Sequence, residues 1–143
     1  MIKENSATPS FNSDKHKIGK ILIAVDKAGY REKIITYGII LAKGTGATVT
    51  AIHVLDESTL EGIGDFFGTR VNEYQKALKN HSEESLTDVR EILEKEGIKT
   101  NTEVISSKSV AQGIIDYAKK SEADVIVIGT KDLGYRYAHL WEA

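Results

Sequence analysis

Short apolar runs alternate along this chain with longer segments in which apolar residues recur every three or four positions. Residues 21–25 and 125–128 are continuously apolar, which is typical of buried parallel strands covered on both faces. Residues 49–54 and 102–105 are predicted to form two further strands. The pattern therefore predicts four strands, separated by segments long enough to hold helices.

Three helices are predicted between the strands, because the apolar positions there repeat with helical spacing. The first helix covers about residues 30–43 and the second about residues 71–96. The third begins at Ser109, which forms a capping box with Gln112. The first helix is predicted to end at Gly44 and Gly46, and the second at Gly97. The residues expected to face the core are Ile34, Ile35, Gly38, Ile39 and Ala42 in the first helix, Val71, Tyr74, Leu78, Leu86, Val89, Ile92 and Leu93 in the second, and Val110, Ile114, Tyr117 and Ala118 in the third.

The strict alternation of strand and helix predicts an α/β fold with a doubly wound parallel sheet. Each crossover is long enough for parallel pairing and should be right-handed. We expect the strand order 3-2-1-4 with helices on both faces. Residues 1–17 are polar and aperiodic, and they are interpreted as a flexible tail. Residues 18–143 are then a single α/β domain.

Composition narrows the possible functions without selecting one. The 143 residues are 41% hydrophobic and 28% charged, with a formal net charge of -2 and no cysteine. Disulfides, thiolate catalysis and cysteine-ligated zinc are excluded. The charge gives no reason to expect nucleic acid or a membrane as a partner. No apolar stretch reaches about 20 residues, and the N-terminus lacks the apolar core of a signal peptide. A cytoplasmic location is expected.

The carboxyl ends of the strands are where such a sheet binds ligands. Asp26 follows the first strand, His53 lies in the second, and Gly129 and Thr130 follow the fourth. Asp26 suits a hydrogen bond to a ribose or a base, but it suits a helix cap equally well. His53 is expected to be a packed or hydrogen-bonded core residue rather than a catalyst, because no acid–histidine–nucleophile set accompanies it. Gly129 could admit a ligand or make a tight turn.

Recognised phosphate and metal motifs are missing. The sequence has no G-x-x-x-x-G-K-[ST] loop, no G-x-G-x-x-G turn after the first strand, and no histidines at metal-ligand spacing. No metal is expected. Aromatic residues gather near the C-terminus at Tyr135, Tyr137 and Trp141. They could stack on a base, but packing or an association surface is the favoured interpretation.

The order and spacing of several segments resemble the universal stress protein family from about residue 20 to residue 143. The first strand ends in Val25-Asp26, and the second contains Ala51-Ile52-His53-Val54. Further matches are the segment 109–118 and the segment 123–130, which reads Ala-Asp-Val-Ile-Val-Ile-Gly-Thr. The resemblance implies the adenine nucleotide α-hydrolase-like fold. It also implies a candidate nucleotide site formed by Ala24, Asp26, Val54, Gly129 and Thr130.

The match to the nucleotide-binding pattern of that family is incomplete. Members that bind ATP carry a glycine, two residues, a second glycine, nine residues, and then a third glycine with Ser or Thr. Counted from Gly129, this chain has Asp132, Glu142 and Ala143 at the remaining positions. Carboxylates there add bulk and negative charge beside the phosphates. No bound cofactor is therefore expected, although ATP or AMP remains possible.

The resemblance also implies a fifth strand beside the fourth, and this strand commonly builds a dimer. The chain ends before such a strand, so residues 125–128 are expected to be an apolar edge that a partner covers. We predict a homodimer. The favoured function is a non-catalytic stress-response domain that acts through association, with ATP binding weak or lost and at most weak ATPase activity. The alternatives are an adenine-nucleotide-binding regulator and, ranked last, an enzyme.

Overall fold

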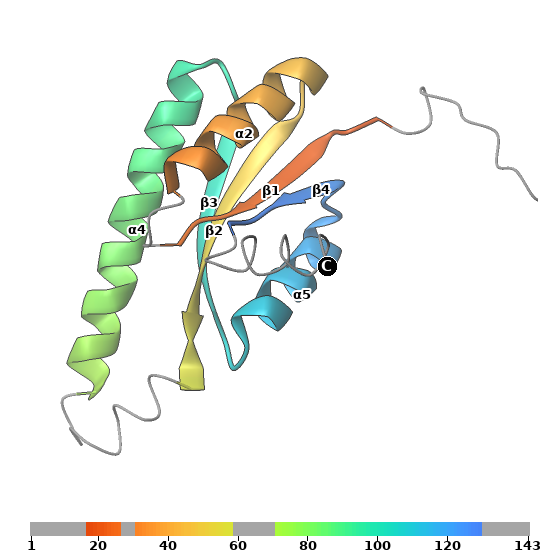
Figure 1. Ribbon diagram of the computed structural model, residues 1–143. Helices are drawn as coiled ribbons and strands as arrows, with labels where there is room; N and C mark the ends of the chain where they lie inside the picture. The colour runs from red at the N-terminus through yellow and green to blue at the C-terminus, as the bar shows by residue number, and fades with distance from the viewer. Residues whose placement is uncertain (1–16, 27–30, 59–70, 130–143) are drawn as a thin grey trace, which may run out of the picture.

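The computed structural model describes residues 17–26, 31–58 and 71–129, and within them the expected alternation of strand and helix is confirmed (Figure 1). The N-terminal tail and the predicted absence of a fifth strand concern residues outside this described part. The elements are β1 (Lys20–Ala24), α2 (Arg31–Thr45), β2 (Thr48–Asp56), α4 (Val71–Lys95), β3 (Thr100–Ser107), α5 (Val110–Ser121) and β4 (Val125–Val127).

The four strands form one parallel sheet in the order β3-β2-β1-β4, as the sequence predicts. Ile23 of β1 pairs with Ala51 of β2 on one side and with Val127 of β4 on the other. Strands β2 and β3 are longer than expected, because their polar ends continue the ladder as far as the pair Asp56 and Ser107. The carboxyl ends of β1, β2 and β4 therefore lie at one edge of the sheet.

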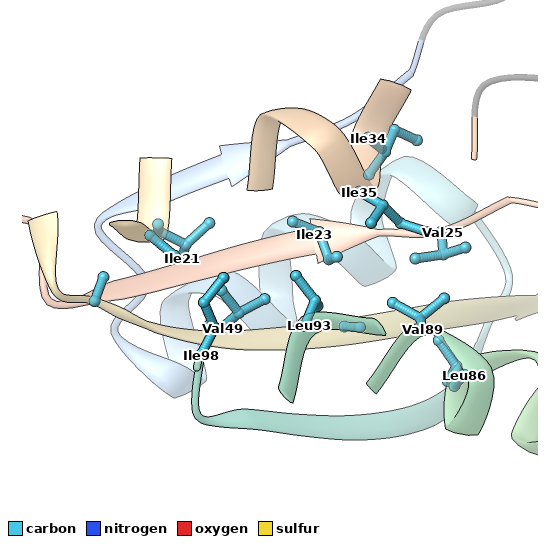
Figure 2. Close-up of a cluster of buried hydrophobic side chains, with 13 residues drawn as sticks. Ile21, Ile23, Val25, Ile34, Ile35, Val49, Leu86, Val89, Leu93 and Ile98 are labelled. Atoms are coloured by element: carbon cyan, nitrogen blue, oxygen red, sulfur yellow. The ribbon is translucent and has the colours of Figure 1, made fainter. Parts of the chain in front are cut away.

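Helices cover both faces of the sheet, with α2 and α4 on one face and α5 on the other (Figure 1). The larger core lies under α2 and α4, and Figure 2 shows its aliphatic side chains. Alternating side chains of β1 point to opposite faces. Ile21 and Ile23 belong to this larger core, and Leu22 belongs to the smaller core under α5. The buried members of the larger core are Ile21, Ile23, Val25, Ile34, Ile35, Ala42, Ala47, Val49, Ala51, Leu86, Val89, Leu93 and Ile98.

Most helix ends follow their sequence signals, but Gly44 does not end α2, because the helix continues through it to Thr45. Ser109 caps α5, and its side chain accepts a hydrogen bond from the Gln112 backbone N–H at 3.2 Å. The Gln112 side chain instead donates to Asp116 at 2.7 Å, so only half of the capping box forms. Gly46 and Gly97 have φ angles of 74° and 80°, a left-handed conformation that glycine adopts without strain and that ends α2 and α4.

Three residues expected in the core are partly exposed instead. Tyr74, Ile92 and Val110 have exposed fractions of 45%, 42% and 41%. Ile92 is adjacent to the fully buried Leu93, and one residue is about 100° of helical rotation. The stripe that α4 buries against the sheet is therefore narrower than the apolar stripe in its sequence. The side chain of Val71 lies outside the described residues.

Strand β4 is also less covered than its sequence predicts. Ile126 and Ile128 are 42% and 53% exposed. Among the described residues β4 is an edge of the sheet, and α5 packs mainly against β2 and β3. Among the described residues, the interpretation of residues 125–128 as covered on both faces therefore does not hold for the α5 face, whereas the expected apolar edge is present.

A carboxylate fixes the start of β4 against β1. The Asp124 side chain accepts hydrogen bonds from the backbone N–H groups of Gly19 and Lys20 at 2.8 and 2.9 Å. The Asp124 N–H donates to the Lys20 carbonyl at 2.8 Å. These backbone donors favour the ionised form and lower the pKa of Asp124.

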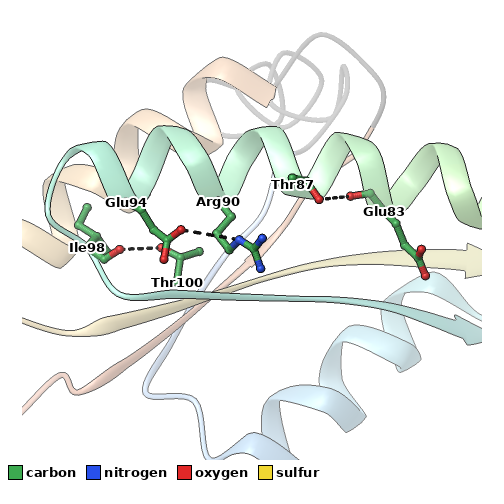
Figure 3. A network of polar contacts seen from close by, with 6 residues as sticks. All are labelled: Glu83, Thr87, Arg90, Glu94, Ile98 and Thr100. Atoms are coloured by element: carbon green, nitrogen blue, oxygen red, sulfur yellow. Dashed lines mark hydrogen bonds and ion pairs between the residues drawn. The ribbon is translucent and has the colours of Figure 1, made fainter.

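The outer face of α4 carries polar and charged side chains. Figure 3 shows the Thr87 hydroxyl donating to the Glu83 carbonyl at 2.9 Å and Arg90 beside Glu94 at 3.7 Å. In the turn that leads into β3, the Thr100 hydroxyl donates to the Ile98 carbonyl at 2.9 Å. These contacts are local and leave the apolar face of α4 for the core.

Candidate functional site

A cleft of about 580 Å³ lies at the carboxyl ends of β1, β2 and β4, on the side of the sheet that α5 covers. Its size is within the range of about 300–1,000 Å³ usual for ligand pockets. Three of the four strands contribute to it, so the ligand position expected for a parallel sheet coincides with a real cavity. The lining residues are Ala24, Val25, Asp26, Ile34, Ile52, His53, Val54, Val110, Ala111, Ile114, Ile115, Ile126, Ile128 and Gly129.

The polar end of the cleft is built where β1 stops. Asp26 is exposed two residues beyond the strand. The Val25 N–H donates to the Ile52 carbonyl at 2.8 Å, which continues the β1–β2 ladder to this point. Asp26 is thus presented from a rigid strand end, and its carboxylate can accept hydrogen bonds from ligand hydroxyl or amino groups.

His53 belongs to the same wall, and its ring is already engaged. The His53 Nδ1 atom lies 2.8 Å from the Val25 carbonyl oxygen. A carbonyl only accepts, so Nδ1 carries the hydrogen and the ring is the Nδ1–H tautomer when neutral. His53 is therefore the hydrogen-bonded residue that the sequence favours. Its contact holds the end of β1 against β2.

The apolar wall is contributed by α5 and β4. Val110, Ala111, Ile114 and Ile115 line the cleft from the first two turns of α5. Ile126 of β4 and Ile128, just beyond the strand, line the same space, as the alternation of extended backbone predicts. Most of the lining is aliphatic, so the cleft suits a ligand with a flat or apolar body and a few polar groups.

A glycine sets how closely α5 approaches the sheet. A Cβ atom built on Gly113 would lie 2.9 Å from the Ser107 Cβ and 3.1 Å from the Val54 Cγ1. Both distances are shorter than ordinary contacts between carbon atoms. The missing side chain thus lets α5 rest directly on β2 and β3, and Val54 forms part of the cleft wall.

Four of the five predicted site residues line this cleft: Ala24, Asp26, Val54 and Gly129. Thr130 lies outside the described residues. Asp132, Glu142 and Ala143, on which the phosphate argument depends, also lie outside them, as do the three aromatic residues near the C-terminus. The sequence did not identify the wall from α5 as part of the site, because Val110 and Ile114 were assigned to the core. Gly113 lies beside them in the sequence, and a glycine within a helix was the one available sign that this helix approaches the sheet closely.

No group of three or more His, Cys, Asp or Glu residues in residues 17–26, 31–58 and 71–129 could hold a metal ion. None of the helices described here is long and apolar enough to cross a membrane.

Comparison with known proteins places this chain in a family. The family model described as "Universal stress protein family" matches residues 17–140. The chain belongs to the universal stress protein family. The resemblance inferred from its strand and glycine segments is thereby confirmed at the level of the family. The match itself does not bear on the altered glycine motif.

Relatives of this universal stress protein differ considerably in sequence. A universal stress protein of Methanocaldococcus jannaschii is 32% identical over 111 residues, which are 78% of this chain and 64% of the relative. The chain thus spans slightly less than two thirds of that relative's length. A universal stress protein of Synechocystis is 25% identical over 124 residues, covering 80% of each chain.

Solved structures agree on the architecture. A member of the family from Burkholderia pseudomallei matches with a TM-score of 0.70 at 19% identity, covering 88% of this chain and 92% of that chain. The universal stress protein of Archaeoglobus fulgidus, solved in complex with dAMP, matches with a TM-score of 0.57 at 24% identity, covering 78% and 80%. At these identities the likeness shows the shared fold, and function has to be argued from the site.

Proposed function

We propose that this universal stress protein domain is a non-catalytic regulator that binds the adenosine part of an adenine nucleotide in the cleft and holds the phosphates weakly. The observation that carries the proposal is the cleft itself. Its wall gathers Ala24, Asp26, Val54 and Gly129, which come from three different strand ends. The family relative from Archaeoglobus fulgidus, whose structure is in complex with dAMP, supports the choice of an adenine nucleotide.

The chemistry of the wall suits a nucleoside. The Asp26 carboxylate can accept hydrogen bonds from the two ribose hydroxyls or from an exocyclic amino group. The aliphatic side chains of Val54 and Ile114 can pack on the faces of a base. Gly129 has no side chain, so its backbone can approach the phosphate end of the ligand. The cleft thus offers a polar contact, an apolar slot and an open backbone in one place.

Weak phosphate binding is proposed on chemical grounds. Asp132 and Glu142 stand where ATP-binding relatives carry glycines, and Ala143 stands where they carry a hydroxyl residue. Two unit charges about 4 Å apart repel by roughly 4 kcal/mol at an effective dielectric of about 20. Carboxylates beside a triphosphate therefore oppose binding. We propose no catalytic role, because the sequence supplies no acid–histidine–nucleophile set in which the other ring nitrogen of His53 could transfer a proton.

Isothermal titration calorimetry with adenosine, AMP and Mg-ATP tests the proposal. Adenosine should bind, and Mg-ATP should bind no more tightly. The Asp26→Ala variant should lose about tenfold or more in adenosine affinity, since a hydrogen bond to a charged group contributes about 1.5–3 kcal/mol. The matched control is Asp56→Ala, which removes a carboxylate at the end of β2 that does not line the cleft.

Two outcomes would contradict this function. Failure of adenosine to bind would reject the cleft as a nucleoside site. Low-micromolar affinity for Mg-ATP would reject the argument about the phosphates. If Mg-ATP binds weakly, the double change Asp132→Gly and Glu142→Gly should raise its affinity. No gain would mean that the two acids do not weaken the phosphate site.

Self-association is a second candidate, carried by a separate observation. Among the described residues β4 is a sheet edge with Ile126 and Ile128 about half exposed. Apolar edge strands tend to pair with other chains, so we propose a homodimer through β4. Light scattering of Ile126→Glu should show a smaller mass than the unchanged protein. The control Ile92→Glu alters an equally exposed isoleucine on α4 and should leave the mass unchanged. A monomer at micromolar concentration would reject the dimer.

A further inference from the structure

A small cavity with polar side chains in a largely apolar lining lies behind the wall of the cleft, between α4 and the ends of β1 and β2. Its volume is about 10 Å³. Three of its lining residues, Val25, Asp26 and His53, also line the cleft, so this short stretch of wall separates the two spaces. The complete lining is Val25, Asp26, His53, Ser82, Ser85 and Leu86.

Ser82 is the unusual residue of this cavity. It is only 2% exposed, and its Oγ atom has no hydrogen-bond partner among the described residues. Three other helical hydroxyls donate a hydrogen bond to the carbonyl four residues earlier. Thr45, Thr87 and Ser121 make that bond at 2.6, 2.9 and 2.8 Å. Ser82 does not, although such a bond is common for serine in helices.

A buried hydroxyl without a partner costs free energy, and the cavity offers a solution. One water molecule needs about 10–15 Å³ and two to four polar partners. The cavity reaches the lower end of that size, and its wall carries the hydroxyls of Ser82 and Ser85, the Asp26 carboxylate and the His53 ring. Because His53 Nδ1 donates to the Val25 carbonyl, the second ring nitrogen of the neutral ring is an acceptor.

We propose that this cavity binds one water molecule, which hydrogen-bonds the Ser82 Oγ and links α4 to the strand ends that form the cleft wall. The water satisfies the one buried hydroxyl of α4 and extends the polar end of the cleft to the opposite face of the sheet. The site is formed by residues of this chain alone. It does not depend on whether a nucleotide binds, so the proposed function and this site can fail separately.

A crystal structure of the unchanged protein at about 1.5 Å resolution is the direct test. Electron density for one water should lie within about 3.2 Å of the Ser82 Oγ and of at least one of Asp26, His53 or Ser85. Absence of density in the cavity would overturn the proposal. So would a Ser82 hydroxyl turned to the carbonyl of Leu78, because the hydroxyl would then have its own partner.

Thermal unfolding of Ser82→Ala gives a second, independent result. Loss of the hydroxyl deprives the water of a partner, so the midpoint temperature should fall by about 3 °C. Without a water the change removes only an unpartnered polar atom, and the midpoint should rise. The control is Thr87→Ala on the outer face of α4, which has the same gain in helix propensity. If the midpoint of Ser82→Ala equals or exceeds that of Thr87→Ala, the water site is rejected.

Discussion

Replacement of Gly113 by alanine tests whether the close approach of α5 shapes the cleft. The new methyl group would meet the Ser107 Cβ at 2.9 Å, the Val54 Cγ1 at 3.1 Å and the Ser107 Oγ at 3.3 Å. The first contact is too short for any real pair of carbon atoms, because such pairs are most stable at about 3.5–4.0 Å. Helix α5 or the strand ends must therefore shift by roughly half an ångström or more.

The expected cost can be worked from two opposing effects. Inserting a methyl group into a well-packed interior costs about 1–3 kcal/mol. Alanine in place of glycine within a helix gains about 1 kcal/mol. The strain exceeds the gain, because Gly113 is buried and two of its three close neighbours are carbon atoms near the backbone of β2 and β3. We expect a net loss of about 1 kcal/mol in the free energy of unfolding, or a fall of about 3 °C in the midpoint temperature.

Chemical denaturation and thermal unfolding measure this difference, and Gly44 provides the control. Gly44 lies in α2 with nothing within 4 Å of the position of an added Cβ. Gly44→Ala should therefore gain stability, by about 0.5–1 kcal/mol. The two variants should shift in opposite directions. If Gly113→Ala is stabilised as much as Gly44→Ala, the contact between α5 and β2 does not limit the position of the helix.

Three further predictions concern the core and two ionisable groups. Leu93→Ala should lower the free energy of unfolding by about 2–5 kcal/mol, because Leu93 is fully buried, whereas the adjacent Ile92→Ala should cost much less. Asp124 has a pKa lowered from 3.8, so its contribution to stability is present above that pH and is lost as the pH falls through the lowered pKa. Asp124→Asn should have a lower free energy of unfolding than the unchanged protein at neutral pH. Its free energy of unfolding should also fall less when the pH is lowered, as measured by denaturation at several pH values. The same pH dependence in both proteins would contradict this. Burial and Glu103 raise the pKa of Tyr117 from 10.0 to about 12, so its contribution holds below pH 10 and is lost as the pH rises toward 12. Ultraviolet titration of Tyr117→Phe should lack the latest tyrosinate transition, and an unchanged titration would show that this tyrosine is not shifted.

Much of the fold was predictable because its signals are local. The apolar run of β1, the glycines that end α2 and α4, and the serine that caps α5 each act within a few residues. Their order also limits the topology, since parallel strands joined by right-handed helical crossovers have few arrangements. The least predictable feature was the burial of side chains at the borders of the core. Ile92 and Ile126 are apolar in sequence, yet each is 42% exposed because of where its element lies against the sheet.

Part of the candidate site was likewise predictable from the sequence, and part of it was not. From the sequence alone we could determine that the strand ends carry Asp26, Val54 and Gly129, because a parallel sheet brings its carboxyl ends to one edge. Only the tertiary structure decided that α5 closes the other side of the cleft and that His53 commits its Nδ1–H to the Val25 carbonyl. It also decided that the Ser82 hydroxyl is buried with no hydrogen-bond partner in the part of the chain that the structure describes. The positions of the strands and helices depend on short-range patterns in the sequence, and right-handed crossovers limit the order of the strands. The position of a helix over a sheet depends on contacts of a few tenths of an ångström between residues far apart in sequence, and no local pattern specifies these.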